Sequence, residues 1–240
     1  MKRKTFLFAL LLAAYPASFA LGGGVFVFNN QDEFHLFMEG KKEQKGVTED
    51  FENSNVGFGE LAFLFGRLEG GVPNIDPFNG LGFPNGLRNF NLIIQTNALE
   101  QGLEIVPGQE LVALGRDFII PGVPNSVVVG ANFFAESLDL IFDPTENHTG
   151  VGFDYIDPVK GIAFITVFDK NDQIIFKEIF KAGGEKQFFG IWSFETIGRI
   201  NIGGPGGELV DNIEMWVPAP GALALLGLAG LLGGRRRRRQ

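Results

Sequence analysis

The chain has 240 residues, no cysteine, only two histidines and a formal net charge of −8 at pH 7. The lack of cysteine excludes disulfide bonds, thiol catalysis and cysteine-ligated zinc, and two histidines are too few for most histidine-based metal sites. The acidic balance argues against nucleic acid as a partner.

The first twenty residues have the pattern of a secretory signal peptide. Three basic residues within the first four positions precede an uninterrupted apolar run over residues 6–14. Small residues at Ser18 and Ala20 suit the −3 and −1 positions of a signal peptidase site. We therefore expect residues 1–20 to form a signal helix that is cleaved after Ala20. The alternative is an N-terminal anchor that stays on the protein, although the apolar run is short for a membrane span.

The next segment, residues 21–216, has the pattern of one all-β domain. Short apolar runs recur between clusters of Gly, Pro, Asn and Asp, which is typical of antiparallel strands. We predict an antiparallel β-sandwich, jelly-roll-like, with about eight to ten strands. The candidate strands span residues 25–28, 60–65, 91–96, 126–129, 138–142, 151–155, 161–168, 173–180, 188–194, 197–202 and 209–217.

Three segments of this domain have patterns of their own. Residues 31–45 suit one or two turns of helix, which we expect to pack across an open sheet edge. Residues 66–89 are rich in glycine and proline and predict a long loop or a pair of turns. Residues 161–180 predict a hairpin whose polar loop lies at residues 169–172, and we prefer this interpretation to a calcium loop because the glycine and glutamate of an EF-hand are missing.

Two acidic segments suggest a metal site. Asp50 and Glu52 flank Phe51 at the start of an expected strand, and Asp211 lies on the last strand. This pattern resembles jelly-roll carbohydrate-binding modules, in which the corresponding segments pair near a structural calcium. The resemblance implies that Asp50, Glu52 and Asp211 hold calcium through oxygen ligands. The alternative is that these residues are solvated carboxylates at strand ends, and no other cofactor is expected.

The sequence contains only weak signals for a catalytic site. Ser137 and Ser193 lie near acidic residues but neither sits in the G-x-S-x-G turn of a serine hydrolase. Four carboxylates lie close together in the sequence. Because glycosidases use a pair of such groups, glycoside cleavage stays open as an alternative. The four are Glu136, Asp139, Asp143 and Asp154. Alternation around Asp139 favours a solvated strand face instead, so we expect a non-catalytic protein.

The last 24 residues form a three-part signal. A proline turn at residues 217–220 precedes an uncharged apolar stretch over residues 221–234, and five arginines follow. Both prolines lack an N–H, so we expect no sheet ladder to run through them. The apolar stretch predicts a short transmembrane helix, and the arginines should stay on the cytoplasmic side. The residues of the signal are Val217, Pro218, Ala219, Pro220, Arg235, Arg236, Arg237, Arg238 and Arg239.

This C-terminus resembles the PEP-CTERM protein-sorting signal, with Ala219 where the family's eponymous tripeptide has Glu. The resemblance implies recognition by exosortase, a transpeptidase-like membrane enzyme of Gram-negative bacteria. It also implies cutting near Pro218–Pro220 after transient anchoring in the inner membrane, and a link with exopolysaccharide and biofilm matrix. The resemblance covers about a tenth of the chain. It says nothing about the activity of the segment between the two terminal signals, which we call the body.

The two ends hold eight of the 20 basic residues and none of the 28 acidic ones, so the body between them has a net charge of −16. We therefore predict an exported, non-catalytic protein of the cell surface or extracellular matrix. The alternatives are a carbohydrate-binding module for exopolysaccharide and, third, a glycan-acting enzyme. An exposed Trp192, Trp216 or Tyr155 on a concave face would favour the module, and a carboxylate pair in a cleft would favour the enzyme.

Overall fold

The computed structural model describes residues 24–97, 111–118, 125–132, 136–157, 161–182, 186–204 and 207–219. The expected signal helix, the cleavage point at Ala20, and the C-terminal helix with Pro220 and the arginines all lie outside these residues. Within the described part, no helix has the length and apolar character that crossing a bilayer requires.

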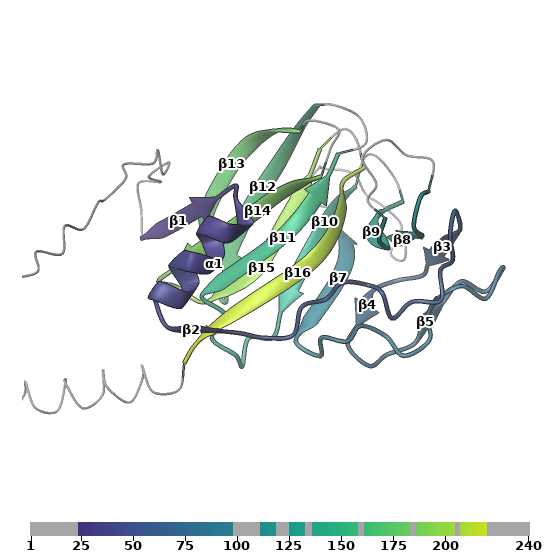
Figure 1. Ribbon diagram of the computed structural model, residues 1–240, viewed down its shortest axis with the longest axis horizontal. Coiled ribbons are helices and arrows are strands. Elements are labelled where there is room, and N and C mark those ends of the chain that lie inside the picture. Colours follow the sequence, from purple (N-terminus) through teal and green to yellow (C-terminus); the bar gives the residue numbers. More distant parts are fainter. Residues whose placement is uncertain are drawn as a thin grey trace, which may run out of the picture.

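Two antiparallel sheets stack face to face and make up most of the described chain (Figure 1). The first sheet runs in spatial order through β1 (Val25–Phe28), β14 (Gln187–Ser193), β11 (Gly150–Ile156), β16 (Leu209–Pro218), β9 (Val128–Ala131), β8 (Leu111–Leu114) and β3 (Leu61–Leu64), with β2 (Glu43–Lys45) beside β16. The second runs through β13 (Ile174–Ala182), β12 (Gly161–Asp169), β15 (Ile197–Gly203), β10 (Ser137–Phe142), β7 (Leu92–Asn97) and β4 (Leu68–Glu69). The expected antiparallel β-sandwich is confirmed.

The core lies between the two sheets because each strand turns alternate side chains inward. On β12, Ala163, Ile165 and Val167 are fully buried in the core, whereas Ile162 and Phe164 face outward and are 41% and 37% exposed. The same alternation on the strands of both sheets supplies a single large cluster of apolar side chains. The hairpin of β12 and β13 has its loop where the sequence predicts it.

Each of the eleven candidate strands given above by residue range coincides with a strand of the structure, with ends that differ by at most two residues. Five short strands were not expected: β2, β4, β8, and the pair β5 (Asn74–Ile75) and β6 (Gly82–Phe83). Three of them lie within residues 66–89, where the sequence predicts a loop. Strands of two residues are too short to show a period of two, so local pattern does not reveal them.

The helix α1 (Gln31–Gly40) confirms the helix expected within residues 31–45 and corrects its expected packing. It ends at Gly40, and the chain continues as β2. It also lies on the outer face of the first sheet, over β11 and β14, and not across a sheet edge (Figure 1). Asn30 caps its start, because the Asn30 side chain accepts a hydrogen bond from the Glu33 N–H at 3.0 Å.

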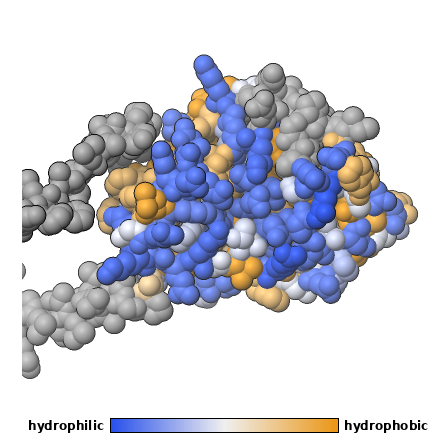
Figure 2. All heavy atoms as spheres, in the orientation of Figure 1, coloured by the Kyte–Doolittle hydropathy of each residue, from blue (hydrophilic) through white to orange (hydrophobic). Residues whose placement is uncertain are grey.

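Glycines make room for α1 on the sheet. Gly152 and Gly190 face each other across β11 and β14, and a Cβ atom on either would lie 2.9 Å from the ring of Phe34. A Cβ on Gly150 would lie 2.1 Å from the terminal methyl of Met38. Phe34 and Met38 are therefore fully buried. Apart from the exposed Leu36, the helix presents mainly hydrophilic side chains to solvent, and most of this face of the molecule is hydrophilic (Figure 2).

The C-terminal strand extends into the expected sorting signal. Val217 and Pro218 belong to β16 and lie opposite Gln44 and Glu43 of β2, so the boundary expected after residue 216 falls inside the strand. Proline is accommodated because it is the last residue of the strand, where no further N–H is needed for the ladder. The Ala219 N–H then donates a hydrogen bond to the carbonyl of Lys42 at 3.4 Å.

Candidate functional site

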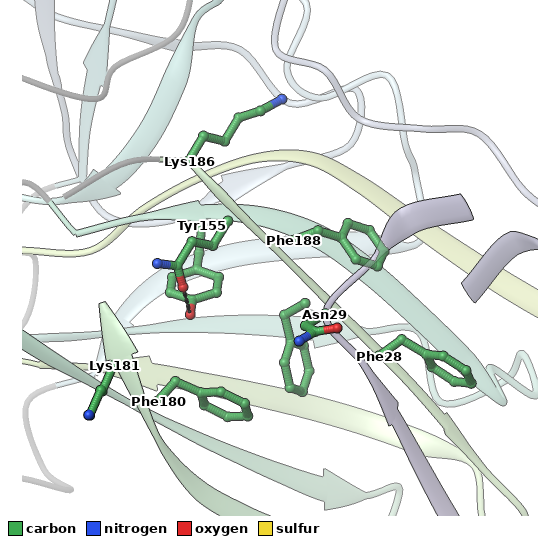
Figure 3. A pocket seen from close by; sticks show the side chains of 9 residues that line it. Phe28, Asn29, Tyr155, Phe180, Lys181, Lys186 and Phe188 are labelled. Carbon is green, nitrogen blue, oxygen red and sulfur yellow. Dashed lines mark hydrogen bonds between the residues drawn. The ribbon is translucent and has the colours of Figure 1, made fainter. Parts of the chain in front are cut away.

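A cleft with a volume of about 480 Å³ opens at the end of the sandwich where the edges of the two sheets meet. One side comes from β13, the edge strand of the second sheet, and the other from β1, β11 and β14 of the first (Figure 3). Its lining combines aromatic rings with amide, hydroxyl and ammonium groups. This mixture suits a ligand with both apolar and hydrogen-bonding surfaces.

Phenylalanine rings form the apolar part of the cleft. Phe189 is almost fully buried, and its ring meets that of Phe180 edge to face with centroids 5.5 Å apart. Phe28 and Phe188 both pack against Phe34 of α1, at 5.4 and 5.7 Å. Phe28, Phe180 and Phe188 are only partly buried, and all three line the cleft. Phe28 and Phe188 reach it from the α1 side of the first sheet, and Phe180 and Phe189 from the side of the core.

A fixed polar pair lies beside these rings. The Tyr155 hydroxyl donates a hydrogen bond to Oε1 of Gln187 at 2.6 Å (Figure 3). Burial raises the pKa of Tyr155 to about 12, so the phenol keeps its proton at neutral pH. Asn29 and Lys181 line the same opening. The cleft therefore holds both donors and acceptors near its aromatic surface.

Lys186 connects the cleft to a buried acidic pair. Its Nζ lies 2.7 Å from Oδ2 of Asp154, and Asp154 lies opposite Asp211 on β16. The side-chain amide of Asn212 donates to both carboxylates, at 2.8 and 3.1 Å. The Ser126 hydroxyl donates to Asp211 at 2.7 Å, and burial raises the pKa of Asp211 to about 6. Neither carboxylate lines the cleft, so this pair does not face a ligand there.

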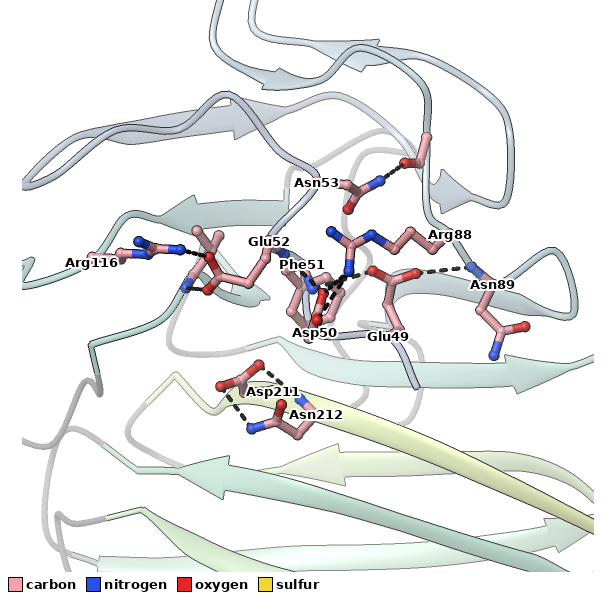
Figure 4. Close-up of polar contacts among 12 residues, drawn as sticks. Glu49, Asp50, Phe51, Glu52, Asn53, Arg88, Asn89, Arg116, Asp211 and Asn212 are labelled. Carbon is pink, nitrogen blue, oxygen red and sulfur yellow. Dashed lines mark hydrogen bonds and ion pairs between the residues drawn. The ribbon is translucent and has the colours of Figure 1, made fainter. Parts of the chain in front are cut away.

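The three residues proposed for calcium each have a protein partner (Figure 4). Asp50 forms an ion pair with Arg88 at 2.7 Å, and Glu52 pairs with Arg116. Asp211 is bonded within the network described above. Across the described ranges, no group of three or more His, Asp or Glu side chains is placed to hold a metal ion. Calcium binding stays a prediction, which thermal melting with and without a chelator tests.

The prediction that a strand starts at Asp50 is wrong. Phe51 has a positive φ of 56° and begins a turn, so residues 50–52 leave the sheet direction. The pairing with the last strand occurs one residue earlier: Glu49 exchanges backbone hydrogen bonds with Ile213 at 2.8 and 2.9 Å. The Glu49 carboxylate is fully buried and accepts the N–H groups of Phe51 and Asn89, which organises the turn.

The carboxylates that gather in the sequence occupy separate places in the fold. Asp139 lies on the outer face of the second sheet and accepts hydrogen bonds from Asn97, Arg199 and Asn201 at 2.7 to 3.0 Å. Asp143 caps a turn by accepting from Thr145. Asp154 belongs to the first sheet, as described above, and Glu136 is buried. Asp139 is only 2% exposed and bonded between strands, so the expectation of a solvated strand face is wrong. The structure does not bring these four carboxylates into one cleft.

The aromatic residues singled out for sugar stacking are buried. Trp192 and Trp216 are each 5% exposed and Tyr155 is 3% exposed. Phe28, Phe180 and Phe188 take the place at the cleft that we expected a tryptophan or tyrosine to have. Sequence reasoning assigned the phenylalanines to the core. No local signal in the sequence marks these three positions, because phenylalanine carries no polar group that would distinguish a cleft position from a core position.

Comparisons with known proteins give weak likenesses. No family model matches the chain, and no curated protein matches it. One solved structure of a CBM29-2 variant, from the family 29 carbohydrate-binding modules, is 12% identical with a TM-score of 0.34 over 65% of this chain and 89% of that chain. Another is 14% identical with a TM-score of 0.30 over 65% and 90%. The enzymatically active domain of tailspike protein 4 from bacteriophage CBA120 is 14% identical with a TM-score of 0.30 over 54% and 19%. With TM-scores below 0.5, these likenesses carry no functional argument.

Proposed function

We propose that the body is a non-catalytic polysaccharide-binding domain of an exported cell-surface or matrix protein, and that the cleft between β13 and β14 is its contact site. One observation carries this proposal: partly exposed phenylalanine rings stand beside the Tyr155–Gln187 pair in one cleft. The C–H faces of a sugar ring pack on aromatic rings, while its hydroxyls need donors and acceptors at the edge. Every sugar unit of a glycan has both C–H faces and hydroxyl groups.

A non-catalytic role is favoured over glycan cleavage by the lining of this cleft. Glycosidases place two carboxyl groups about 5 to 9.5 Å apart on either side of the bond that is cut. Among the residues that the structure describes, the lining of the cleft contains phenylalanine, tyrosine, amide and lysine side chains and no carboxylate. The adjacent Asp154 is paired with Lys186. These groups can hold a sugar, but they supply neither the acid nor the nucleophile.

Affinity electrophoresis and calorimetry of the purified protein with neutral and acidic polysaccharides test this proposal. Phe180→Ala and Phe188→Ala should weaken binding about tenfold each, because an aromatic anchor contributes more than ~1 kcal/mol. Phe78→Ala is the matched control, since Phe78 is 84% exposed and lies away from the cleft. Binding that survives both cleft substitutions, or no binding to any polysaccharide, would overturn the proposal.

We further propose that the protein is exported by its first twenty residues, anchored transiently in the inner membrane and processed by exosortase at residues 217–220. The order of proline turn, apolar stretch and five arginines supports this proposal. Replacing the five arginines with glutamine should retain or misplace the protein. Replacing them with lysine keeps the charge and should preserve delivery. Cell fractionation locates each variant. Normal surface delivery of the glutamine variant would contradict the proposal.

A further inference from the structure

A second pocket, with a volume of about 280 Å³, lies beside the C-terminal half of β16 and away from the cleft. It is bounded by the segments around residues 46–47, 88–91 and 146–148. Its lining includes Phe90, Asn91, Glu146, His148 and Met215. Among the described residues, it shares no lining residue with the cleft between β13 and β14, so the two sites are chemically independent.

His148 is the unusual member of this lining. It is 1% exposed, and neither ring nitrogen has a hydrogen-bond partner in the part of the chain that the structure describes. The closest carboxylate oxygen, on Glu146, is 3.7 Å from Nε2, beyond hydrogen-bond distance. Leaving a buried polar group unpaired costs about 1 to 3 kcal/mol. The imidazole therefore has hydrogen-bonding capacity that the described protein groups do not use.

The His148 side chain is held in place by its surroundings. Its backbone carbonyl accepts the N–H of Ile197 at 2.7 Å, and its ring lies 5.9 Å from that of Phe142. Burial lowers the pKa of His148, so the ring is neutral at pH 7 and offers one donor and one acceptor nitrogen. An uncharged hydroxyl is the natural partner for such a group, because it can accept from one nitrogen or donate to the other.

Phe90 supplies an exposed apolar surface in the same pocket. It is 78% exposed, yet its ring rests on the backbone of Gly71, where a Cβ atom would lie 2.5 Å from a ring carbon. Gly71 has a φ of +71°, which also disfavours other residues there. The next residue, Asn91, is anchored through its N–H to Asn89 Oδ1 at 3.0 Å. Phe90 is thus an ordered ring with one side backed by the chain and the other open.

From this arrangement we infer that the second pocket binds a single hydroxylated ring, of the size and chemistry of one neutral sugar residue. The ring of the ligand would lie on Phe90, and its hydroxyls would meet His148, Asn91 and Glu146. The inference extends the proposed glycan binding to a separate site, but it uses no residue of the cleft. A glycan chain that reached both places would gain avidity from the second contact.

Imidazole nitrogen NMR of the full-length protein tests this inference directly. The chain has only two histidines, so a His35→Gln variant assigns the remaining signals to His148. Glucose, galactose and mannose at millimolar concentration are the probes, with glycerol as an open-chain polyol. At least one sugar should shift the His148 nitrogens in a saturable way and leave the His35 signals in place. No shift with any sugar, or an equal shift with glycerol, would overturn the inference.

Two variants separate this site from the cleft and from folding effects. Phe90→Ala should weaken the sugar response of His148 about tenfold, as expected for loss of an aromatic anchor. Phe58→Ala, at an exposed phenylalanine outside the pocket, should leave the response unchanged. Phe180→Ala removes a cleft ring and should also leave it unchanged. A response that is lost in Phe180→Ala but kept in Phe90→Ala would assign the sugar to the cleft and reject the second site.

Discussion

The ammonium nitrogen of Lys41 lies 4.5 Å from the centroid of the Trp192 ring. The rings of Phe37, Phe194 and Phe26 surround the same nitrogen at 5.2, 5.8 and 6.0 Å. Lys41 follows directly after α1, while Trp192 lies on β14, so this contact ties the end of the helix to the sheet. The aromatic quadrupoles favour a cation at this position.

Replacing Lys41 with methionine tests the strength of this contact. Methionine keeps a long apolar side chain but removes the charge, so the free energy of unfolding should fall by about 1 kcal/mol. Lys170→Met, in the exposed hairpin loop, is the control and should change it little. Urea denaturation measures both variants. Equal effects of the two substitutions would show that the ring cluster does not stabilise the charge.

Gly190→Ala tests the close packing of α1 on the glycines of β11 and β14. A Cβ atom at Gly190 would lie 2.8 Å from the Phe188 ring and 2.9 Å from the Phe34 ring, so the rings or the helix must shift, at a cost of about 1 to 3 kcal/mol. Gly40→Ala is the matched control, because a Cβ there meets nothing within 4 Å. Thermal melting should show a lower Tm for Gly190→Ala only. A lower Tm for both variants alike would point to backbone effects instead of crowding.

The buried carboxyl of Asp211 predicts a specific pH dependence. Its pKa rises from the usual 3.8 to about 6 because burial disfavours the charge. Its contribution to stability is therefore fully present below about pH 3.8 and is lost as the pH rises through about 6. As the pH falls from about 7.5 to about 4, the free energy of unfolding of the native protein should rise by about 2 to 3 kcal/mol relative to that of Asp211→Asn.

The measurement is the difference in unfolding free energy between native protein and Asp211→Asn at each pH. Using the difference removes the general acid destabilisation that all other carboxylates cause. Asp172→Asn, at a carboxylate whose side chain is 70% exposed, is the control. A difference that stays constant with pH for Asp211→Asn would mean that Asp211 titrates near its ordinary value.

Arg199→Lys tests the network on the outer face of the second sheet. The Arg199 guanidinium donates to Asp139 at 3.0 Å and to Asp172 at 2.9 Å, and it stacks 3.7 Å above the Phe168 ring. Lysine keeps the charge but loses the planar fork and the stacking, which should cost about 1 to 2 kcal/mol. Arg67→Lys, at an exposed arginine, should have little effect. Equal melting curves for the two variants would contradict this role.

The strands were predictable because their signals are local. Alternating side chains and the turn residues between them lie within a few positions of one another, so residues 161–180 specify their hairpin directly. The turn at Phe51 was not predictable in this way, since the positive φ of that residue is held by Glu49, whose carboxylate also accepts the distant Asn89 N–H. Contacts between distant segments override the local extended pattern there.

Both pockets depend on contacts that sequence spacing does not encode. The cleft joins Phe28, Tyr155, Phe180 and Phe188 from four strands of two sheets. Trp192 and Trp216, the residues that composition alone favours for sugar contact, are covered by α1 and its neighbours. Phenylalanine carries no polar group, so nothing in its local sequence distinguishes a core position from a cleft position.

The sequence by itself determined the all-β class, the positions of the longer strands, and the expectation of export and C-terminal sorting. Each of these follows from the period, charge or order of residues that are neighbours in the chain. Only the tertiary structure decided which sheet face α1 covers, that β16 continues through Pro218, and which rings line a cleft. These features arise where segments far apart in the chain pack together, and packing geometry is a property of the whole fold.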